Sequence, residues 1–523
     1  MSRPPKARKR LSREDQRVHR ERQARLDPEQ QRKALLADEL GTIIRDAPLR
    51  IALCYPNPYR TAMSSLGYQV IYRMMNSRPA VSAERVILSD DIAEFRRRGF
   101  APASLETGRP LSAFDVVAFS LTYDLDITGF FEMLDLAGIP LLRADRGEGD
   151  PPVILGGPLT ASNALPFGPF IDFAIIGDGE VAVGALMDVL ETARDRDDLL
   201  DGASRIEGVW VPERDGDRVP ATQKVSVGVL PAVGQIITPH TELSNMFLIE
   251  ASRGCPRYCK FCLVRAPESP MRETELEEVL SHIPAHAPRV GFVGAAVSEW
   301  GGIREALRRV VAMGKGVGVS SLRADRLDAD FVGLLAQGGY RTMTVASDAA
   351  SQRLRGKLAK GIRARHLIDA AQLARDAGMV RMKMYVIVGL PDERDEDIDE
   401  LIALCQELGR ILPTALGISP LVPKLHTPLG DAPYAGIPEV TRTLSRLERG
   451  LRGSAEVRST SAKWAWVEYR MSQGGQDAGL AALKAWRAGA GFRDWERAFQ
   501  DADERGGLTA AVSADLWPAA GMK

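Results

Sequence analysis

The chain has 523 residues, 45% of them hydrophobic and 26% charged, with a formal net charge of −1. This balance gives no overall field that would attract nucleic acid, and no apolar run reaches the roughly 20 residues of a membrane span. The length favours two or three domains, and five cysteines are too few for a secreted disulfide scaffold, so we expect a cytoplasmic protein.

The N-terminal segment, residues 1–46, is strongly charged. Its first 33 residues hold twelve Lys and Arg against five Asp and Glu, with almost no large apolar side chains. Such a segment cannot bury enough apolar surface to order itself. We expect a solvated basic tail, available to an acidic partner, and then a helix over Gln30–Asp46.

Residues 47–200 alternate short apolar strands with helical stretches. This alternation predicts an α/β domain of flavodoxin-like or Rossmann-like type, with a parallel sheet covered on both faces. Its loops at the carboxyl ends of strands are where a ligand would bind, although Gly and Pro also serve simply to turn the chain. The expected strands are Leu49–Cys54, Val86–Leu88, Val116–Ser120, Val153–Leu155 and Phe173–Ile176.

The remainder divides into three parts. Residues 201–245 are expected to be a linker with a β-hairpin, because Gly208–Pro212 and Gln223–Val227 flank a turn-rich stretch. Residues 246–438 repeat the strand and helix alternation six times, which predicts a partial (β/α)6 barrel of TIM type with its chemistry at the carboxyl end. Residues 439–523 are expected to be helical, with tryptophans that pack rather than form a site. The expected barrel strands are Met246–Ala251, Val290–Gly294, Gly316–Leu322, Arg341–Ala346, Met382–Val388 and Leu416–Leu421.

Three cysteines, Cys255, Cys259 and Cys262, follow the first barrel strand with the spacing C-x-x-x-C-x-x-C. Thiolates hold iron–sulfur clusters, and three of them leave one iron of a four-iron cube free to bind a small molecule. Zinc is the main alternative, but a structural zinc site needs four ligands, and neither His240 nor His282 has a suitable spacing. An inert group of thiols is the remaining alternative.

This cysteine loop resembles the radical S-adenosylmethionine (radical SAM) superfamily. The resemblance implies a 4Fe–4S cluster that chelates S-adenosylmethionine (SAM), takes an electron from a small donor such as a flavodoxin or ferredoxin, and yields a 5′-deoxyadenosyl radical. The motifs at the other strand ends match as well, including Gly294-Ala-Ala296 and Tyr385-Val-Ile-Val-Gly-Leu-Pro391. The residues that the resemblance places at these cofactors are Phe261, Gly294, Ala295, Ser321, Arg323, Asp348, Ser351, Gly389 and Leu390.

Several of these residues also have structural interpretations. Arg323 would either pair with the SAM carboxylate or form an ion pair with Asp325 or Asp328. Asp348, where relatives usually carry Glu, would hold an amine or hydroxyl of SAM or cap the next helix, and Ser351 is an equally good cap. Lys424 and His426 follow the last barrel strand and would face either substrate or the surrounding loop.

Residues 49–200 resemble the cobalamin-binding domain that precedes many radical SAM barrels, chiefly in Ile154-Leu-Gly-Gly-Pro158 and Ile176-Gly-Asp-Gly-Glu180. This implies a cobalamin cofactor. No histidine occurs between Ala47 and Pro239, so no imidazole of this domain would ligate cobalt. The implied cobalamin residues are Ser65, Leu66, Gly67, Thr122, Gly156, Gly157, Pro158, Gly177, Gly179 and Glu180.

The resulting hypothesis is a cobalamin-dependent radical SAM enzyme, a C-methyltransferase, whose substrate the sequence does not identify. One alternative is a radical SAM enzyme with a degenerate cobalamin domain that catalyses cyclisation or methylthiolation. Methylthiolation is disfavoured, because those relatives carry a second cysteine trio where this chain has only Cys54. The other alternative is a non-enzymatic iron–sulfur protein that regulates or associates with RNA through its basic tail.

Overall fold

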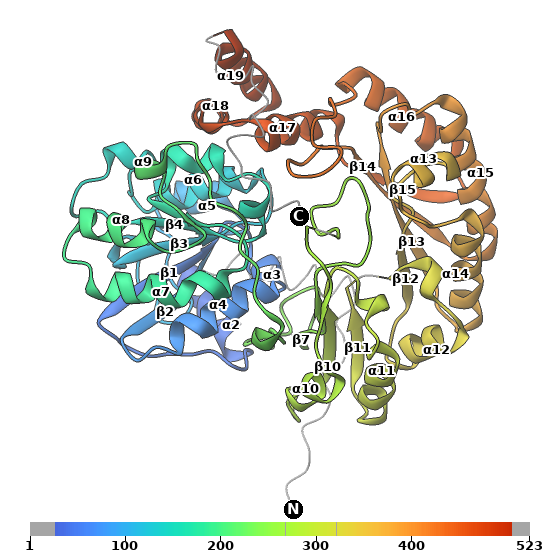
Figure 1. The fold of residues 1–523 in the computed structure, drawn as a ribbon, viewed down its shortest axis with the longest axis horizontal. Helices are drawn as coiled ribbons and strands as arrows, with labels where there is room; N and C mark the ends of the chain where they lie inside the picture. Colours follow the sequence, from blue (N-terminus) through green and yellow to red (C-terminus); the bar gives the residue numbers. More distant parts are fainter. Residues whose placement is uncertain (1–26, 267, 321, 505–523) are drawn as a thin grey trace, which may run out of the picture.

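The computed structural model describes residues 27–266, 268–320 and 322–504. Figure 1 shows two α/β units side by side, joined along one edge by the helices that follow the second unit. None of the helices in the described ranges is long and apolar enough to cross a membrane. The predicted mixed α/β class is therefore confirmed, while the basic segment before residue 27 lies outside the described residues.

The first unit contains one six-stranded sheet in the order β2-β1-β3-β4-β5-β6, the flavodoxin-like arrangement with one added edge strand. The first five strands are parallel and β6 is antiparallel to β5. Separate apolar cores cover the two faces of the sheet. The strands are β1 (Leu49–Tyr55), β2 (Val81–Ile87), β3 (Val116–Ser120), β4 (Val153–Gly156), β5 (Phe173–Ile175) and β6 (Val209–Trp210).

Strand β2 begins five residues earlier than the sequence suggested. The polar residues Ser82, Glu84 and Arg85 hide it from a search for apolar runs, yet all three are buried. They are tolerated because each has partners: Arg85 pairs with Glu106 at 2.6 Å and with Glu39 at 2.7 Å, so the buried charges are compensated.

Helices flank this sheet and cover both of its faces (Figure 1). The helix expected over Gln30–Asp46 is shorter than predicted, because α2 ends at Ala37 before Gly41, which has a φ of +97°. The helices are α2 (Pro28–Ala37), α3 (Tyr59–Ala62), α4 (Leu66–Asn76), α5 (Ile92–Arg97), α6 (Asp126–Leu136), α7 (Gly179–Thr192), α8 (Arg196–Ser204) and α9 (Pro212–Asp215).

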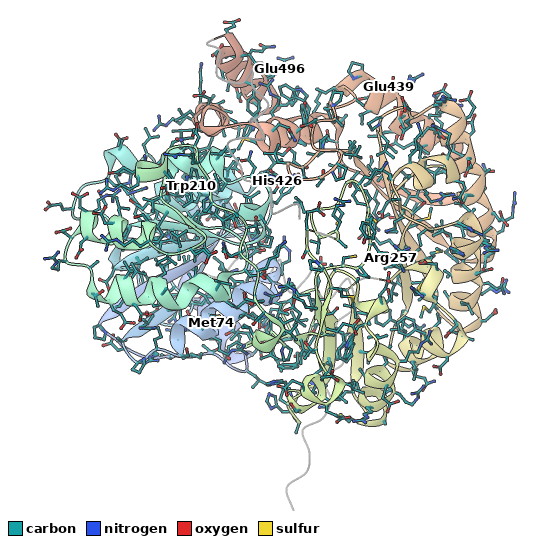
Figure 2. The ribbon with its side chains drawn as sticks, in the orientation of Figure 1. Met74, Trp210, Arg257, His426, Glu439 and Glu496 are labelled. Carbon is teal, nitrogen blue, oxygen red and sulfur yellow. The ribbon has the colours of Figure 1, made fainter. Side chains whose placement is uncertain are left out.

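The hairpin predicted within residues 201–245 is wrong. Val209–Trp210 pairs with β5, and Gln223 forms an isolated bridge with Gly177 at the end of the same strand. Both segments therefore add to the sheet of the first unit instead of to each other. Trp210 is fully buried in that unit, which ties the supposed linker to its core (Figure 2).

Within its described residues, the second unit has seven parallel strands in two sheets, β11-β10-β7 and β12-β13-β14-β15. The six predicted strands are present, and the break between β11 and β12 divides the expected partial barrel. The sequence missed β15 because its side chains are mostly exposed and polar. The strands are β7 (Met246–Glu250), β10 (Arg289–Val293), β11 (Gly316–Val319), β12 (Thr342–Ala346), β13 (Arg381–Val388), β14 (Thr414–Pro420) and β15 (Ala455–Ser459).

One apolar core lies between these sheets and the helices outside them. Cys405 is buried in this core and Cys54 in the core of the first unit, as expected of inert thiols. The helices of the second unit are α10 (Leu276–Ser281), α11 (Ile303–Ala312), α12 (Ala329–Gln337), α13 (Gln352–Lys357), α14 (Ala364–Asp376), α15 (Asp395–Ile411) and α16 (Ile437–Gly450).

The C-terminal helices pack against the first unit, although they follow the second in sequence. They are α17 (Ala462–Gln473), α18 (Gln476–Arg487) and α19 (Phe492–Glu504). Trp495 and Phe499 share a core with the aromatic side chains of α6, and the ring of Trp486 lies tilted against that of Phe131, with their centres 5.8 Å apart. The predicted packing role of the tryptophans is confirmed for Trp495, whereas Trp464 is partly exposed.

Candidate active site

The three-cysteine loop begins at the carboxyl end of β7 and is closed at its base by a short antiparallel pair, β8 (Ser252–Arg253) with β9 (Arg272–Glu273). Gly254 has a φ of +85°, and a Cβ there would lie 2.2 Å from the carbonyl oxygen of Pro270. Only glycine fits this close approach. The Cys255 N–H donates to the Ser269 carbonyl at 2.9 Å, so the first thiol starts from a fixed backbone position.

The three thiols lie near one another. Burial raises the pKa of Cys259, and it raises the pKa of Cys262 to about 11, with the neighbouring thiolates contributing in both cases. Holding three thiolates together therefore needs a cation, and iron–sulfur clusters supply one. Within the described residues, no three Cys, His, Asp or Glu side chains converge as the ligands of one ion would. A cube does not require that convergence, since its thiolates bind separate irons, so the donor set fits a cluster.

A largely buried network of ion pairs supports the cysteine loop. Arg257, two residues after the first cysteine, forms a two-pronged contact with Glu299 at 2.6 and 2.7 Å, and Figure 2 shows it within the second unit. Glu299 also contacts Arg323 at 3.1 Å, and Arg323 in turn contacts Asp325 at 3.1 Å. Arg323 is only 9% exposed, so the structure places it within this network and favours the ion-pair interpretation.

The strand-four residues adjoin the same network. Asp348 has a φ of +57° and pairs with Lys360, whose carbonyl accepts a hydrogen bond from Arg323 at 2.9 Å. Ser351 is fully buried; its hydroxyl accepts from the Leu354 N–H and contacts Asp397. Ser351 is thus the cap of α13, and Asp348 is not.

The remaining residues expected at the SAM cofactor lie at neighbouring strand ends. Gly294 and Gly389 shape their turns: a Cβ on Gly294 would meet the Ser252 carbonyl at 2.6 Å, and Gly389 has a φ of +74°. Ala295 is exposed, Leu390 is buried, and Phe261 packs on the barrel core. Ser321 lies outside the described residues.

The strand-end loops of the first unit meet the cysteine loop. Arg253, two residues before Cys255, contacts Asp178 in the loop after β5 at 3.3 Å, Glu180 in the first turn of α7 at 2.8 Å, and Glu250 of β7 at 2.6 Å. Burial acts to raise the pKa of Glu180, but the hydrogen bond and charge of Arg253, with a backbone hydrogen bond and the charge of Arg272, together lower that pKa below its usual value. One guanidinium therefore joins the ligand edge of the first sheet to the base of the cysteine loop.

A second polar junction lies on the other side of this region. Lys424, after β14, pairs with Glu468 of α17 at 2.9 Å and with Asp124, which follows β3. The Tyr123 hydroxyl donates to Glu468 at 2.7 Å. Lys424 is therefore engaged between units, whereas His426 is exposed in the space between them, as Figure 2 shows.

The residues expected at cobalamin fall into two groups. Gly67 in the first turn of α4, Gly156 at the end of β4, and the exposed Pro158 and Thr122 beyond the ends of β4 and β3 border open space, and a Cβ added to Gly67 would meet no atom within 4 Å. Gly157, Gly177 and Gly179 instead allow close packing of the chain itself, since a Cβ at each would lie within 3 Å of another residue. Ser65 caps α4, Leu66 packs beside β7, and Glu180 binds Arg253. The open group leaves room for a flat ligand at the strand ends.

Sequence reasoning missed the charged residues that hold the loop, namely Arg253, Arg257 and Glu299. The two arginines stand beside the cysteines, so their proximity was visible, but their partners are 42 to 73 residues away in the chain. Only the fold identifies which carboxylates face them.

Two family models match the chain. Residues 67–212 match the family described as radical SAM proteins, N-terminal, and residues 249–405 match the radical SAM superfamily. An uncharacterised protein of Methanocaldococcus jannaschii is 28% identical over 387 residues, which span 72% of this chain and 78% of that protein. A protein of Pyrococcus horikoshii called an uncharacterised methyltransferase is 25% identical over 49% of this chain and 58% of its own length.

Solved structures are more distant. The cobalamin-dependent SAM radical enzyme OxsB, solved with aqua-cobalamin and SAM bound, is 14% identical with a TM-score of 0.48. That match covers 78% of this chain but only 56% of the OxsB chain. SuiB of Streptococcus suis, bound to SAM, is 15% identical over 43% of this chain and 52% of its own, with a TM-score of 0.33.

Proposed function

Because the chain belongs to the radical SAM superfamily of enzymes, we propose that Cys255, Cys259 and Cys262 hold a 4Fe–4S cluster with one iron open to SAM. The observation that carries this proposal is the three-thiol loop itself, closed by Gly254 at the carboxyl end of β7. When bound, the cluster and SAM would supply a 5′-deoxyadenosyl radical that removes a hydrogen atom from substrate.

The protein's own residues prepare the site for that chemistry. The contact between Arg257 and Glu299 fixes the cysteine loop in position. Gly294 and Gly389 have no side chain, so the backbone at the neighbouring strand ends can approach other residues closely. Arg323 supports Lys360 and Asp348 instead of offering a free guanidinium. Pairing of these largely buried charges holds the loop in one geometry.

We further propose that the first unit binds cobalamin and that the reaction is C-methylation. The flavodoxin-like strand order and the open space beside Gly67 and Gly156 support a flat ligand, and Arg253 links that edge of the sheet to the cysteine loop. The name of the Pyrococcus relative is consistent with methyl transfer. The bound cobalamin would supply a methyl carrier, and without a histidine in residues 48–238 no imidazole of this unit would ligate its cobalt.

The second candidate is another radical SAM reaction in a chain that has lost cobalamin binding. The absent histidine and the glycines that serve only internal packing favour it. In both cases we propose a cytoplasmic enzyme that takes its electron from a small flavodoxin or ferredoxin.

Anaerobic reconstitution with iron, sulfide and cobalamin tests these proposals. Retained cobalamin in the visible spectrum, with both 5′-deoxyadenosine and S-adenosylhomocysteine formed from SAM, is the result expected of a cobalamin-dependent methyltransferase. Formation of 5′-deoxyadenosine alone, with no cobalamin retained, supports the second candidate. No SAM cleavage by a fully loaded cluster contradicts both.

A further inference from the structure

The two sheets of the second unit differ in the polarity and exposure of the face that is turned away from their outer helices. On the three-stranded sheet, Met246 and Leu248 of β7 are buried against Leu66 and Val70 of α4, a helix of the first unit. The first unit therefore covers this part of the barrel interior with apolar contacts, and Glu250, the next residue of β7 on the same face, is already paired with Arg253.

On the four-stranded sheet the corresponding face is polar and open. Alternate residues of β13, from Met382 to Val388, are buried against the outer helices. The residues between them face the opposite way, and Tyr385 is 43% exposed although β13 has a strand on each side. In a closed TIM barrel these positions are filled by branched apolar side chains. Here they are Arg381, Lys383, Tyr385 and Ile387.

Positive charge predominates on this face. Arg381 and Arg458 both contact Glu456, at 3.1 and 2.7 Å, and Glu456 is the acid on this side of the four strands. Lys383 forms no ion pair with any residue that the structure describes; its ammonium lies 4.6 Å from the centre of the Tyr385 ring. A half-buried ammonium beside an aromatic face is a good partner for an anion with a flat or apolar body.

The neighbouring strand makes room for such a body. Tyr385 pairs in register with Gly417 of β14, and a Cβ on Gly417 would lie 2.8 Å from the ring of Tyr385. Glycine thus lets the ring lie over the sheet instead of standing up from it. The carbonyl of Tyr385 accepts from the N–H groups of Ser347 and Asp348, so this face leads directly to the strand end beside the cysteine loop.

We propose that the inner face of β12–β15 is the substrate face and that Lys383 and Tyr385 select an anionic substrate, a carboxylate or phosphate carried on a flat or apolar body. The inference rests on the proposed function, which puts the radical at the neighbouring strand end. Lys383 binds the anion, Tyr385 packs on the body, and Gly417 keeps the space open.

Three probes that share a naphthalene ring test the charge preference of the reconstituted holoenzyme. They are naphthalene-2-carboxylate, 2-naphthyl phosphate and the neutral naphthalene-2-carboxamide. At least one anion is expected to bind about tenfold more tightly than the carboxamide, as one charge-assisted contact allows. The better of the two anions identifies the carboxylate or phosphate class. Lys383→Met is expected to remove the preference, leaving the carboxamide affinity unchanged.

Lys463→Met is the matched control, because the ammonium of Lys463 also lies over a ring, 5.0 Å from Phe492, but on α17. It is expected to keep the preference. Equal affinities for all three probes in the wild type, or an unchanged preference in Lys383→Met, would overturn the inference. A separate assay of SAM cleavage by the wild type distinguishes this failure from failure of the proposed function. If the protein prefers anions but does not cleave SAM, Lys383 and Tyr385 form an anion site, but the assignment of this face to the substrate is refuted.

Discussion

Replacing Arg253 by Met removes the guanidinium that joins the two units beside the cysteine loop. It contacts Glu180 at 2.8 Å and Glu250 at 2.6 Å, and its side chain is 17% exposed. Losing one member of a largely buried charge cluster costs about 3–5 kcal/mol, because the carboxylates left behind have no comparable cation. We expect that loss in the free energy of unfolding of the apoprotein, measured by urea denaturation at neutral pH.

A double-mutant cycle with Glu180→Gln isolates the contact between units. The expected coupling is about 1.5–3 kcal/mol, as for a hydrogen bond between charged groups. The exposed pair Arg304 and Asp328, also at 2.8 Å, is the control and should couple several-fold more weakly. A coupling for Arg253 and Glu180 no larger than that of the control would refute the argument that this contact orients the two units.

The same pair predicts a pH dependence with a definite sign. The hydrogen bond from Arg253 lowers the pKa of folded Glu180 below its usual value of 4.5. A lowered pKa contributes stability that is complete above the unfolded value and disappears as the pH falls through the folded value. The stability difference between wild type and Glu180→Gln should therefore be constant near neutrality and shrink below about pH 4.5.

Three further changes test the support of the site. Gly254→Ala forces a left-handed φ and a contact with the Pro270 carbonyl, so reconstituted iron should fall well below wild type; a normal iron content would contradict the loop geometry. Glu299→Gln weakens the contacts of three arginines, Arg257, Arg323 and Arg326, and should speed iron loss to a chelator, whereas the exposed Glu305→Gln should not. Lys424→Met leaves the largely buried carboxylates of Asp124 and Glu468 without their cation and should cost about 3 kcal/mol of stability in urea; a cost under 1 kcal/mol would count against that junction.

Much of the fold was predictable because parallel strands buried on both faces are short apolar runs between helices. The exceptions have physical causes. Strand β2 contains Arg85, whose burial depends on two distant carboxylates, and β15 is an exposed edge strand with no apolar run. The hairpin was mispredicted because turn chemistry gives the ends of strands but not their partners.

The site was predictable only where chemistry is encoded locally. The cysteines, and Ser351 as a helix cap, follow from spacing and residue type. The role of Arg323 depends on Glu299, and the role of Glu180 depends on Arg253 in another unit; no local pattern contains either pair. The open polar face at Lys383 could not be predicted either. Alternation of side chains distinguishes the two faces of a strand, but it does not show that the first unit covers the sheet of β7 and leaves that of β13 open.

The central claim is that three thiolates hold a four-iron cluster with one iron open. It is tested most directly by electron paramagnetic resonance of the reduced, reconstituted protein with and without SAM. We predict about four irons per chain and a cluster signal that changes when SAM is added. A protein that loads zinc instead of iron, or a cluster signal that SAM leaves unchanged, would contradict the claim.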